Sequence, residues 1–257
     1  MKHVVTKRQF LRWSLASAGG LILAGCDRLG QTSWFPKVLT VGEALNHRAQ
    51  KALLSRKAMA EEFTEADLSP SFRSNGTDNP NSAAYQALVK NRFADWSLVI
   101  DGLVEKPLSL SLADLHAMPS RTQITRHDCV EGWSAIGKWK GVPLQHILQV
   151  AHPTAAAKFA VFHCADPMES DGSSLYYESI DLDDATHPQT ILAYELNNVA
   201  LPVANGAPLR LRVERQLGYK QAKYLMRIEL VDSFDHIAGG KGGYWEDSNG
   251  YQWYAGI

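Results

Sequence analysis

RHDCVEGW, residues 126–133, decides most about this chain, and WKGVPL follows it at residues 139–144. Cys129 stands near the centre of the first stretch, among charged residues and a following glycine. A cysteine thiolate is a soft ligand that suits a redox metal, and it acts as a nucleophile only when it is ionised and accessible. A free cysteine is equally able to serve as a small buried core residue. The residue type alone therefore leaves a metal ligand and a core cysteine open.

Two further interpretations of Cys129 depend on other residues. The chain has three cysteines, and in an oxidising compartment Cys129 and Cys164 could pair as a disulfide. His127 lies two residues before Cys129, and positions two apart share one face of an extended strand. The pair could therefore be the nucleophile and base of a hydrolase, although no oxyanion feature or third orienting residue stands out. The disulfide and the hydrolase remain alternatives.

Three segments of the chain together resemble the sulfite oxidase superfamily of molybdopterin-dependent oxidoreductases. They are the stretch around Cys129, NGAPLR at 205–210 and GYKQAK at 218–223, in the order and spacing of that family. The resemblance covers most of residues 68–235 and is to the small exported branch that includes the periplasmic methionine sulfoxide reductase catalytic subunit. It implies a single-domain α+β fold, mixed and mostly β, with peripheral helices. It also implies that the Cys129 thiolate binds the metal of a molybdenum–molybdopterin cofactor, which argues against the disulfide.

The resemblance further implies which residues hold the cofactor. The loop at 68–82 is rich in Ser, Asn, Pro and Gly, and an asparagine amide can both donate and accept at a pterin edge. Molybdopterin ends in a phosphate, which arginine can bind bidentately and lysine as a compact charge. Cys164 stands where a polar pterin contact is expected, although a core position fits it equally well. The expected cofactor residues are Asn75, Cys129, Cys164, Asn205, Arg210, Lys223 and, through backbone groups, Gln221 and Ala222.

Other charged and ring residues have simpler interpretations. Arg212, Arg215 and Arg227 share the basic stretch with Arg210, and for them a solvated strand face and a cofactor contact are equally open. Two further histidines are expected to be hydrogen-bonded structural residues and not ligands, namely His163 and His187.

Oxygen-atom transfer at molybdenum is the chemistry that the resemblance implies, as sulfoxide reduction or as sulfite-type oxidation of a small-molecule or protein substrate. The sequence has no Cys-x-x-Cys-His haem motif, so electrons would be exchanged with a separate membrane-bound or haem protein. The formal net charge of −1 does not favour nucleic acid as a partner. A non-catalytic cell-envelope binding protein on the same fold is the main alternative, and the Cys–His hydrolase is the other.

The first 26 residues have the layout of an export signal. A basic start is followed by a short apolar run at 15–24, which is too short to span a bilayer. TKRQFLR at 6–12 resembles a twin-arginine motif, with Lys7 in place of the first arginine. LAGC at 23–26 resembles a lipobox, which predicts lipidation of Cys26. The following Asp27 resembles an inner-membrane retention signal, so we expect the protein on the periplasmic side of the envelope, lipid-anchored to the inner membrane.

The rest of the chain divides by composition and periodicity. Residues 46–66 favour a helix by propensity, and 209–214 alternate apolar and charged residues as a half-buried strand does. The expected regions are the signal at 1–26, a spacer and helix at 27–66, the molybdopterin-binding domain at 67–238 and a Gly-rich connection with an aromatic tail at 239–257. Further expected elements are strands at 96–103, 122–126, 159–163, 190–196, 199–202 and 226–230, and helices at 112–118, 143–150 and 180–185.

Overall fold

The computed structural model describes residues 32–35, 38–39, 41–42, 45–46, 48–49, 58–169 and 171–257. The chain divides into two compact units, residues 1–55 and 56–257. The export motif, the lipobox and Cys26 lie outside the described residues, so their predictions stay predictions. None of the described helices combines the length and the apolar character needed to cross a bilayer.

The helix predicted over 46–66 is only partly present. Every described position from 35 to 49 is helical. The helix prediction is therefore confirmed at positions 46, 48 and 49, and the described positions from 35 to 45, which were expected to be a spacer, are helical as well. From residue 58 onward the helix prediction is wrong. The Gln189 side chain accepts the Ala60 N–H at 2.8 Å and donates to the Ala60 carbonyl at 3.0 Å, which holds this backbone extended. A 3-10 turn, η1 (Glu65–Asp67), follows.

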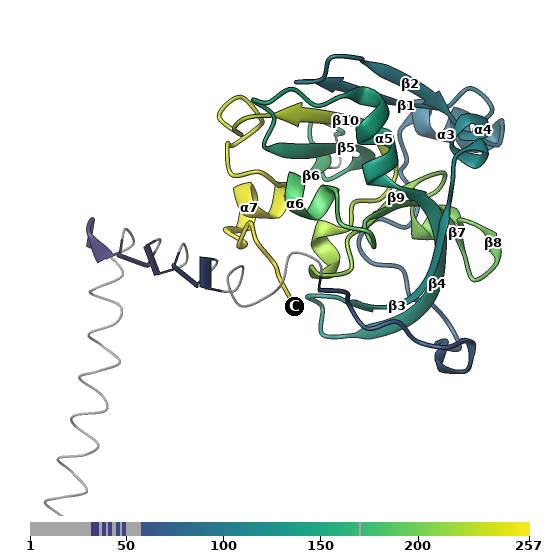
Figure 1. The fold of residues 1–257 in the computed structure, drawn as a ribbon, viewed down its shortest axis with the longest axis horizontal. Coiled ribbons are helices and arrows are strands. Elements are labelled where there is room, and N and C mark those ends of the chain that lie inside the picture. Colours follow the sequence, from purple (N-terminus) through teal and green to yellow (C-terminus); the bar gives the residue numbers. More distant parts are fainter. Residues whose placement is uncertain are drawn as a thin grey trace, which may run out of the picture. The chain divides into compact units, whose positions relative to one another are not determined.

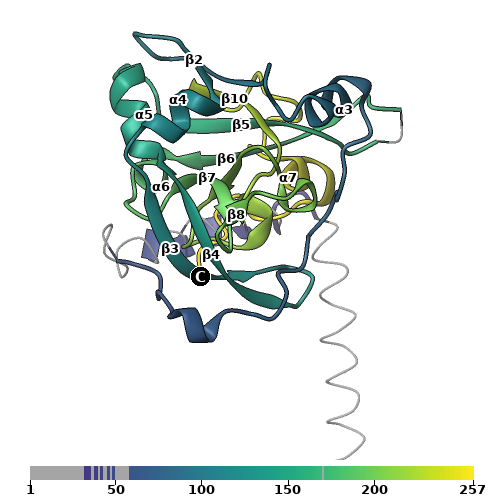
Figure 2. The same cartoon turned by 90° about the vertical axis from the view of Figure 1, so that its right-hand side faces the viewer.

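The first sheet of the larger unit has five strands in the order β2–β1–β10–β5–β6 (Figures 1 and 2). β1 and β10 run parallel, and the other neighbours are antiparallel. Buried and half-buried positions alternate in β1, as expected for a strand with one face on the core. The strands are β1 (Ser97–Gly102), β2 (Leu108–Ser111), β5 (Phe159–Pro167), β6 (Leu175–Asp181) and β10 (Leu225–Val231).

The second sheet has the order β3–β4–β7–β8, and β9 pairs with β7 (Figure 1). β7 and β8 are joined by Asn197 and Asn198, whose φ angles of 53° and 65° suit a tight hairpin turn. The strands are β3 (Arg121–Asp128), β4 (Ser134–Pro143), β7 (Ile191–Leu196), β8 (Val199–Ala200) and β9 (Arg210–Arg212).

Short helices lie around the two sheets. Ser111 caps the first turn of α4, as its position before an apolar helix predicts. The expected turn at 180–185 forms a helix that begins after Asp181. The helical elements are α3 (Ala83–Lys90), α4 (Leu112–Ala117), α5 (Leu144–Ala151), α6 (Leu182–Ala185), η2 (Val203–Asn205), η3 (Gly218–Lys220) and α7 (Tyr244–Asn249).

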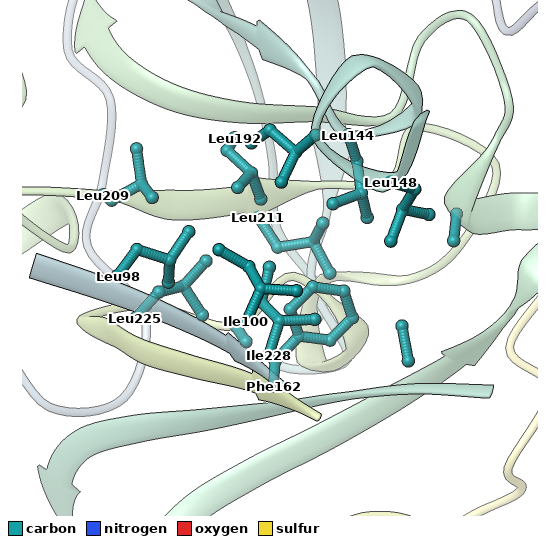
Figure 3. Packing of buried hydrophobic residues seen from close by; sticks show 14 of the residues in the cluster. Leu98, Ile100, Leu144, Leu148, Phe162, Leu192, Leu209, Leu211, Leu225 and Ile228 are labelled. Carbon is teal, nitrogen blue, oxygen red and sulfur yellow. The ribbon is translucent and has the colours of Figure 1, made fainter. Parts of the chain in front are cut away.

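The hydrophobic core fills the space between the sheets and α5, as Figure 3 shows. Leucine and isoleucine side chains from β1 and β10 meet Phe162 of β5 on one side and Leu144 and Leu148 of α5 on the other. One such core is what a single domain of this size requires. The predicted mixed, mostly β single-domain fold is therefore confirmed.

Three features differ from the sequence expectations. β9 is not half-buried, because Arg210, Leu211 and Arg212 are all fully buried. β2, β4, β6 and α3 were not predicted, since the three strands lack clean alternation of apolar and polar residues, and the Ser82 cap of α3 follows a loop rich in similar residues. Residues 239–257 belong to the same compact unit as the sheets and contain α7, whose Asp247 accepts the backbone N–H groups of Gly239 and Lys241.

Candidate cofactor and active site

Cys129 lies at the tip of the β3–β4 hairpin, directly after the strand that was predicted to lead to it. Its backbone N–H donates to the Trp133 carbonyl at 3.0 Å, and its own carbonyl accepts from Gly132 at 3.0 Å. Gly132 has a φ of +84°, which favours glycine at this turn. Cys129 and Cys164 are both free thiols, so the disulfide alternative is wrong.

A cavity of about 240 Å³ opens beside this tip. It brings together four of the expected cofactor residues, Asn75, Cys129, Gln221 and Lys223, from three separate segments of the chain. The remaining lining comes from Gly76, Thr77, Val130, Glu131, Asp166, Met168, Tyr176, Gly218, Tyr219, Trp245 and Tyr251.

The Cys129 thiol sits among one acidic and one basic neighbour. Burial raises its pKa and the Glu131 charge also raises it, whereas backbone hydrogen bonds from Glu131 and Val130 and the Arg73 charge lower it. The Arg73 guanidinium lies 5.5 Å from the centroid of the Trp133 ring. A nucleophilic cysteine of a hydrolase needs a lowered pKa, whereas the surroundings of Cys129 raise its pKa.

His127 lies behind the cavity and not in its lining. Its Nδ1 accepts from Arg212 at 3.0 Å, and Arg212 also donates twice to Glu214. Burial, followed by the charges of Arg212 and Arg210, holds the pKa of His127 well below its usual range. A Cβ on Gly218 would come within 2.6 Å of the His127 Nε2, so only glycine lets η3 approach this ring. His127 is thus a packed structural residue, and the hydrolase alternative has no accessible base.

Lys223 ties one wall of the cavity together. Its Nζ donates to backbone carbonyls of Asn75 at 2.6 Å, Thr77 at 2.5 Å and Ala204 at 3.1 Å, and to the Ser74 hydroxyl at 3.3 Å. Burial, followed by the Arg210 charge, lowers the pKa of Lys223 to about 7. The N–H groups of this ammonium are therefore committed to the loop that carries Asn75 and to Ala204.

Arg210 and Asn205 lie behind the cavity wall and do not line it. Arg210 donates to the Asn205 carbonyl at 2.9 Å and to the Gln221 carbonyl at 3.2 Å, and its guanidinium lies 5.1 Å from the Trp139 ring centroid. Burial lowers its pKa to about 9. The arginine joins two of the segments that were expected to hold the cofactor, and its direct contact with a phosphate stays a prediction.

Cys164 and Ala222 are also outside the cavity lining. Cys164 is 2% exposed within the main core, and its Sγ lies 3.8 Å from the Phe162 carbonyl. The Ala222 carbonyl accepts from Leu211 at 2.8 Å, so this backbone group is already used in the fold. The structure favours a packing position for both residues, and their cofactor contacts stay predictions.

The other arginines and histidines that were considered in the sequence bind protein groups. Arg227 donates to Asp101 and Glu229, and His163 also contacts Glu229 at 2.9 Å. His187 Nε2 lies 3.2 Å from the Ala58 carbonyl. Arg215 binds Asp184. These residues support the fold away from the cavity, and Arg212 does so from behind it.

Sequence reasoning missed several cavity residues. Tyr219, Trp245 and Tyr251 form one aromatic wall, with Trp245 and Tyr251 stacked at 5.9 Å between centroids. Asp166 and Glu131 add two carboxyl groups. Three of them had a local signal, since Glu131 and Asp166 each lie two residues after an expected cofactor cysteine and Tyr219 lies within GYKQAK. Trp245 and Tyr251 are distant in the chain and had none.

The side chains around the site fit the cofactor that the resemblance implies. Within the described part of the chain, several buried polar atoms in the cavity wall or directly behind it lack a hydrogen-bond partner. Asn75 Oδ1, Asp166 Oδ1 and Gln221 Oε1 are acceptors, whereas Asn205 Nδ2 and Arg210 Nε are donors. Buried polar groups are normally paired, so such a set indicates a ligand that both donates and accepts. A pterin with a phosphate does both, and the free Cys129 thiol supplies a ligand for molybdenum.

Comparison with known proteins agrees with this chemistry. The profile of the oxidoreductase molybdopterin binding domain matches residues 85–236. A putative protein-methionine-sulfoxide reductase subunit, YedZ1, from Azospira oryzae is 35% identical over 97% of this chain and 87% of that protein. The protein-methionine-sulfoxide reductase catalytic subunit MsrP of Xanthomonas axonopodis pv. citri is 34% identical over 92% of this chain and 74% of that protein.

A solved structure, the sulfane dehydrogenase SoxCD from Paracoccus pantotrophus, aligns with a TM-score of 0.49 and 25% identity over 56% of this chain and 41% of that chain. From the matched profile and the two relatives, the chain belongs to the oxidoreductase molybdopterin-binding domain family of the sulfite oxidase superfamily, and it is a molybdenum–molybdopterin oxidoreductase.

Proposed function

We propose that this protein reduces methionine sulfoxide to methionine on the periplasmic side of the cell envelope, with electrons from a separate membrane-bound or haem protein. The sulfoxide accepts two electrons and two protons, its S–O bond breaks, and a thioether and water leave. The bound cofactor supplies the two-electron redox chemistry, and the chain binds and orients the cofactor and the substrate. The names of the two relatives, which include a methionine sulfoxide reductase catalytic subunit, support this substrate.

The observation that carries the proposal is the aromatic wall of the cavity. Tyr219 and Tyr251 meet edge to face at 5.1 Å, and Trp245 stacks on Tyr251. Met168 completes an apolar surface that opens beside Cys129. A thioether sulfur makes favourable contacts with aromatic rings, so this wall suits the methionine that the reaction forms and the methylene groups of the uncharged sulfoxide.

The charges that line the cavity support a neutral substrate. Glu131 and Asp166 bring carboxyl groups, and Lys223 is the one cationic side chain among the lining residues that the structure describes. Its ammonium is already committed to four oxygens. An anion such as sulfite needs uncommitted cations or N–H donors, and a carboxylate beside it is unfavourable.

Sulfite-type oxidation is the second candidate, and one residue favours it. Arg73 is exposed and near enough to Cys129 to lower the pKa of its thiol. A guanidinium at that place could attract an anion toward the mouth of the cavity. The two candidates therefore differ in the residue on which they depend, Trp245 for the sulfoxide and Arg73 for sulfite.

Electron supply and location complete the proposal. The described residues contain no cluster of His, Cys, Asp and Glu that could hold a further metal ion, and the sequence has no haem attachment motif. We infer that a partner protein delivers the electrons, and that a lipid on Cys26 keeps the enzyme at the inner membrane, where such a partner has a high effective concentration.

The test begins with protein purified from a molybdenum-replete host. Molybdenum and pterin near one per chain would separate an enzyme from a non-catalytic binding protein. Turnover of peptide-bound methionine sulfoxide with a reduced dye is then compared with sulfite oxidation by an oxidised dye. We expect Trp245→Ala to raise KM for the sulfoxide about tenfold, with recovery in Trp245→Phe. Faster sulfite turnover that falls in Arg73→Ala and not in Trp245→Ala would establish the second candidate instead.

A further inference from the structure

Three charged side chains are buried together next to the aromatic wall of the cavity. Lys220 and Glu178 are 0% exposed, and Glu246 is 1% exposed. The Lys220 Nζ donates to a carboxylate oxygen of Glu178 and, at 2.9 Å, to Oε1 of Glu246. None of the three residues lines the cavity, and the proposed reaction uses none of them. We call these three residues the Lys220 cluster.

The Lys220 cluster joins three segments of the chain. Lys220 ends η3 directly before Gln221, Glu178 lies in β6, and Glu246 lies in the first turn of α7. α7 is held beside β6 by a backbone bridge between Glu178 and Gly243 (Figure 1). A Cβ on Gly243 would collide with carboxylate oxygens of both Glu178 and Glu246, so the backbone before α7 packs directly on the cluster.

Two members of the cluster are next in sequence to residues of the aromatic wall. Tyr219 precedes Lys220, and its ring lines the cavity. Trp245 precedes Glu246, and its ring lines the cavity as well. The contact between Lys220 and Glu246 therefore holds together the two short helices that carry these rings. Trp245 also stacks on Tyr251, which extends the same wall.

Stability alone does not account for the cluster. One cation faces two carboxyl groups, and Oε2 of Glu178 and Oε2 of Glu246 have no hydrogen-bond partner among the residues that the structure describes. Burial raises the pKa of Glu178 well above its usual range, Lys220 opposes this shift, and the Glu246 charge adds to it. A buried ion pair contributes little net stability compared with apolar residues of similar volume. Its contacts nevertheless select one arrangement of the segments that it joins.

We propose that the Lys220 cluster positions Trp245 through Glu246, and that residues 244–251 are the element that selects the sulfoxide side chain. The choice of substrate rests on the proposed function, whereas the positioning of α7 does not. Lys220 and Glu246 are positioning residues, because they act on the cavity only through the rings beside them.

The experiment uses two conservative changes at Glu246 in the full chain loaded with cofactor. Glu246→Asp keeps the charge and shortens the side chain by one methylene group, which breaks the contact with Lys220. Glu246→Gln keeps the length and an oxygen that accepts from Lys220, and Glu178 can then ionise in its place. We expect Glu246→Asp to raise KM for peptide-bound methionine sulfoxide about tenfold, with kcat and pterin content near wild type, and Glu246→Gln to raise it at most about twofold.

Glu105→Gln is the matched control, because it removes an exposed carboxylate whose ion-pair partner is His152 at 3.6 Å. We expect its KM, kcat and pterin content to equal those of wild type. Loss of pterin in Glu246→Asp would place Glu246 in cofactor binding through η3 and would overturn the proposal.

A double variant, Trp245→Ala with Glu246→Asp, separates positioning from an independent effect. If Glu246 acts through Trp245, the double variant should have the KM of Trp245→Ala alone. Independent effects would instead multiply to about a hundredfold, because the free energies of uncoupled changes add. A multiplied effect would overturn the proposal.

Amide hydrogen exchange tests the position of α7 without any substrate. Exchange at residues 244–250 should rise in Glu246→Asp and stay near wild type in Glu246→Gln. Equal exchange in all chains, or a rise throughout residues 58–257, would overturn the positioning role. Absence of sulfoxide turnover in wild type would overturn the proposed function instead, and a local rise in Glu246→Asp would still support the positioning of α7.

Discussion

Lys223 and Asn75 are 148 residues apart in the chain, yet the Lys223 ammonium donates to the Asn75 carbonyl at 2.6 Å. The same ammonium reaches Thr77 and Ala204, so one buried cation joins two backbone segments, the loop at 74–77 and the turn at Ala204. A side chain expected to contact a phosphate thus also determines where the Asn75 loop lies. The cofactor site and the fold around it share the same residue.

Lys223→Met should release the loop at 74–77 and lower cofactor content. Hydrogen bonds from a buried charge to three carbonyls disappear, which costs on the order of 3 kcal/mol. Amide hydrogen exchange at residues 74–77 should rise, and pterin per chain should fall. Lys138→Met is the matched control, because Lys138 has a surface ion pair with Glu65 worth about 0–1 kcal/mol. Equal exchange rates in both variants would show that Lys223 does not anchor the loop.

Arg210→Ala should lower both stability and cofactor occupancy, whereas Arg227→Ala should change little. Arg210 is fully buried and donates to the carbonyls of Asn205 and Gln221, so its loss should cost about 3 kcal/mol and leave both segments unsupported. Arg227 is partly exposed beside Asp101 and Glu229, where such pairs contribute about 0–1 kcal/mol. Urea unfolding and pterin content measure the two effects. The same pterin content in both variants would mean that Arg210 does not serve the cofactor.

Cys129→Ser should remove molybdenum-centred activity while the fold survives. A hard hydroxyl replaces a soft thiolate, and Cys129 lies at a half-exposed hairpin tip where the change of one atom creates no core cavity. Molybdenum content, the electron paramagnetic resonance signal of the metal and Tm are measured on the same preparation. Full activity in the serine variant, or a Cys129–Cys164 disulfide in active protein, would contradict the assignment of the metal ligand.

Protonation of His127 in the unfolded chain should make the protein less stable as the pH falls below about 6.5, which is the pKa of an unfolded histidine. Burial and the Arg212 charge hold its pKa well below that in the folded state, so the unfolded chain binds a proton that the folded chain does not. Stability is therefore present above pH 6.5 and is lost toward the folded pKa, by about 1.4 kcal/mol per pH unit. His163 and His187 shift in the same direction.

The contribution of His127 is isolated by His127→Gln, in which an amide oxygen can still accept from Arg212. Urea unfolding between pH 7 and pH 5 should give a shallower loss of stability in this variant than in wild type. If the free energy of unfolding fell equally with pH in both proteins, protonation of His127 would not contribute to the loss of stability.

Cys26→Ser should move the protein from the membrane to the soluble envelope fraction and slow turnover with the native electron partner, while turnover with a small dye is unchanged. The lipid anchor concentrates the enzyme near a membrane partner, and a freely diffusing dye does not need it. Lys7→Ala together with Arg8→Ala should block export and leave a cytoplasmic precursor. Continued membrane binding of the Cys26→Ser protein through an uncleaved 15–24 segment would exclude lipidation, and unchanged turnover with the partner would exclude the role in electron transfer.

Sequence alone was enough for the features that depend on neighbouring residues. The segment around Cys129 and the two segments after it identify the cofactor, because a metal ligand and its turn are built from adjacent positions. The cap at Ser111 and the Asn197–Asn198 turn are local for the same reason. Alternation also located β10. For β9 it predicted that the charged side chains face solvent, whereas the structure buries Arg210 and Arg212.

Tertiary structure decided which side chains meet in the cavity. Trp245 and Tyr251 carry no local signal of function, and they line one site with Cys129 and Asp166 only because strands and a C-terminal helix converge there. The burial of Arg210 likewise depends on Trp139 and on carbonyls from two other segments. Local sequence sets backbone conformation through short-range sterics and hydrogen bonds, whereas burial and the environment of a charge depend on residues far away in the chain, which pattern and spacing do not encode.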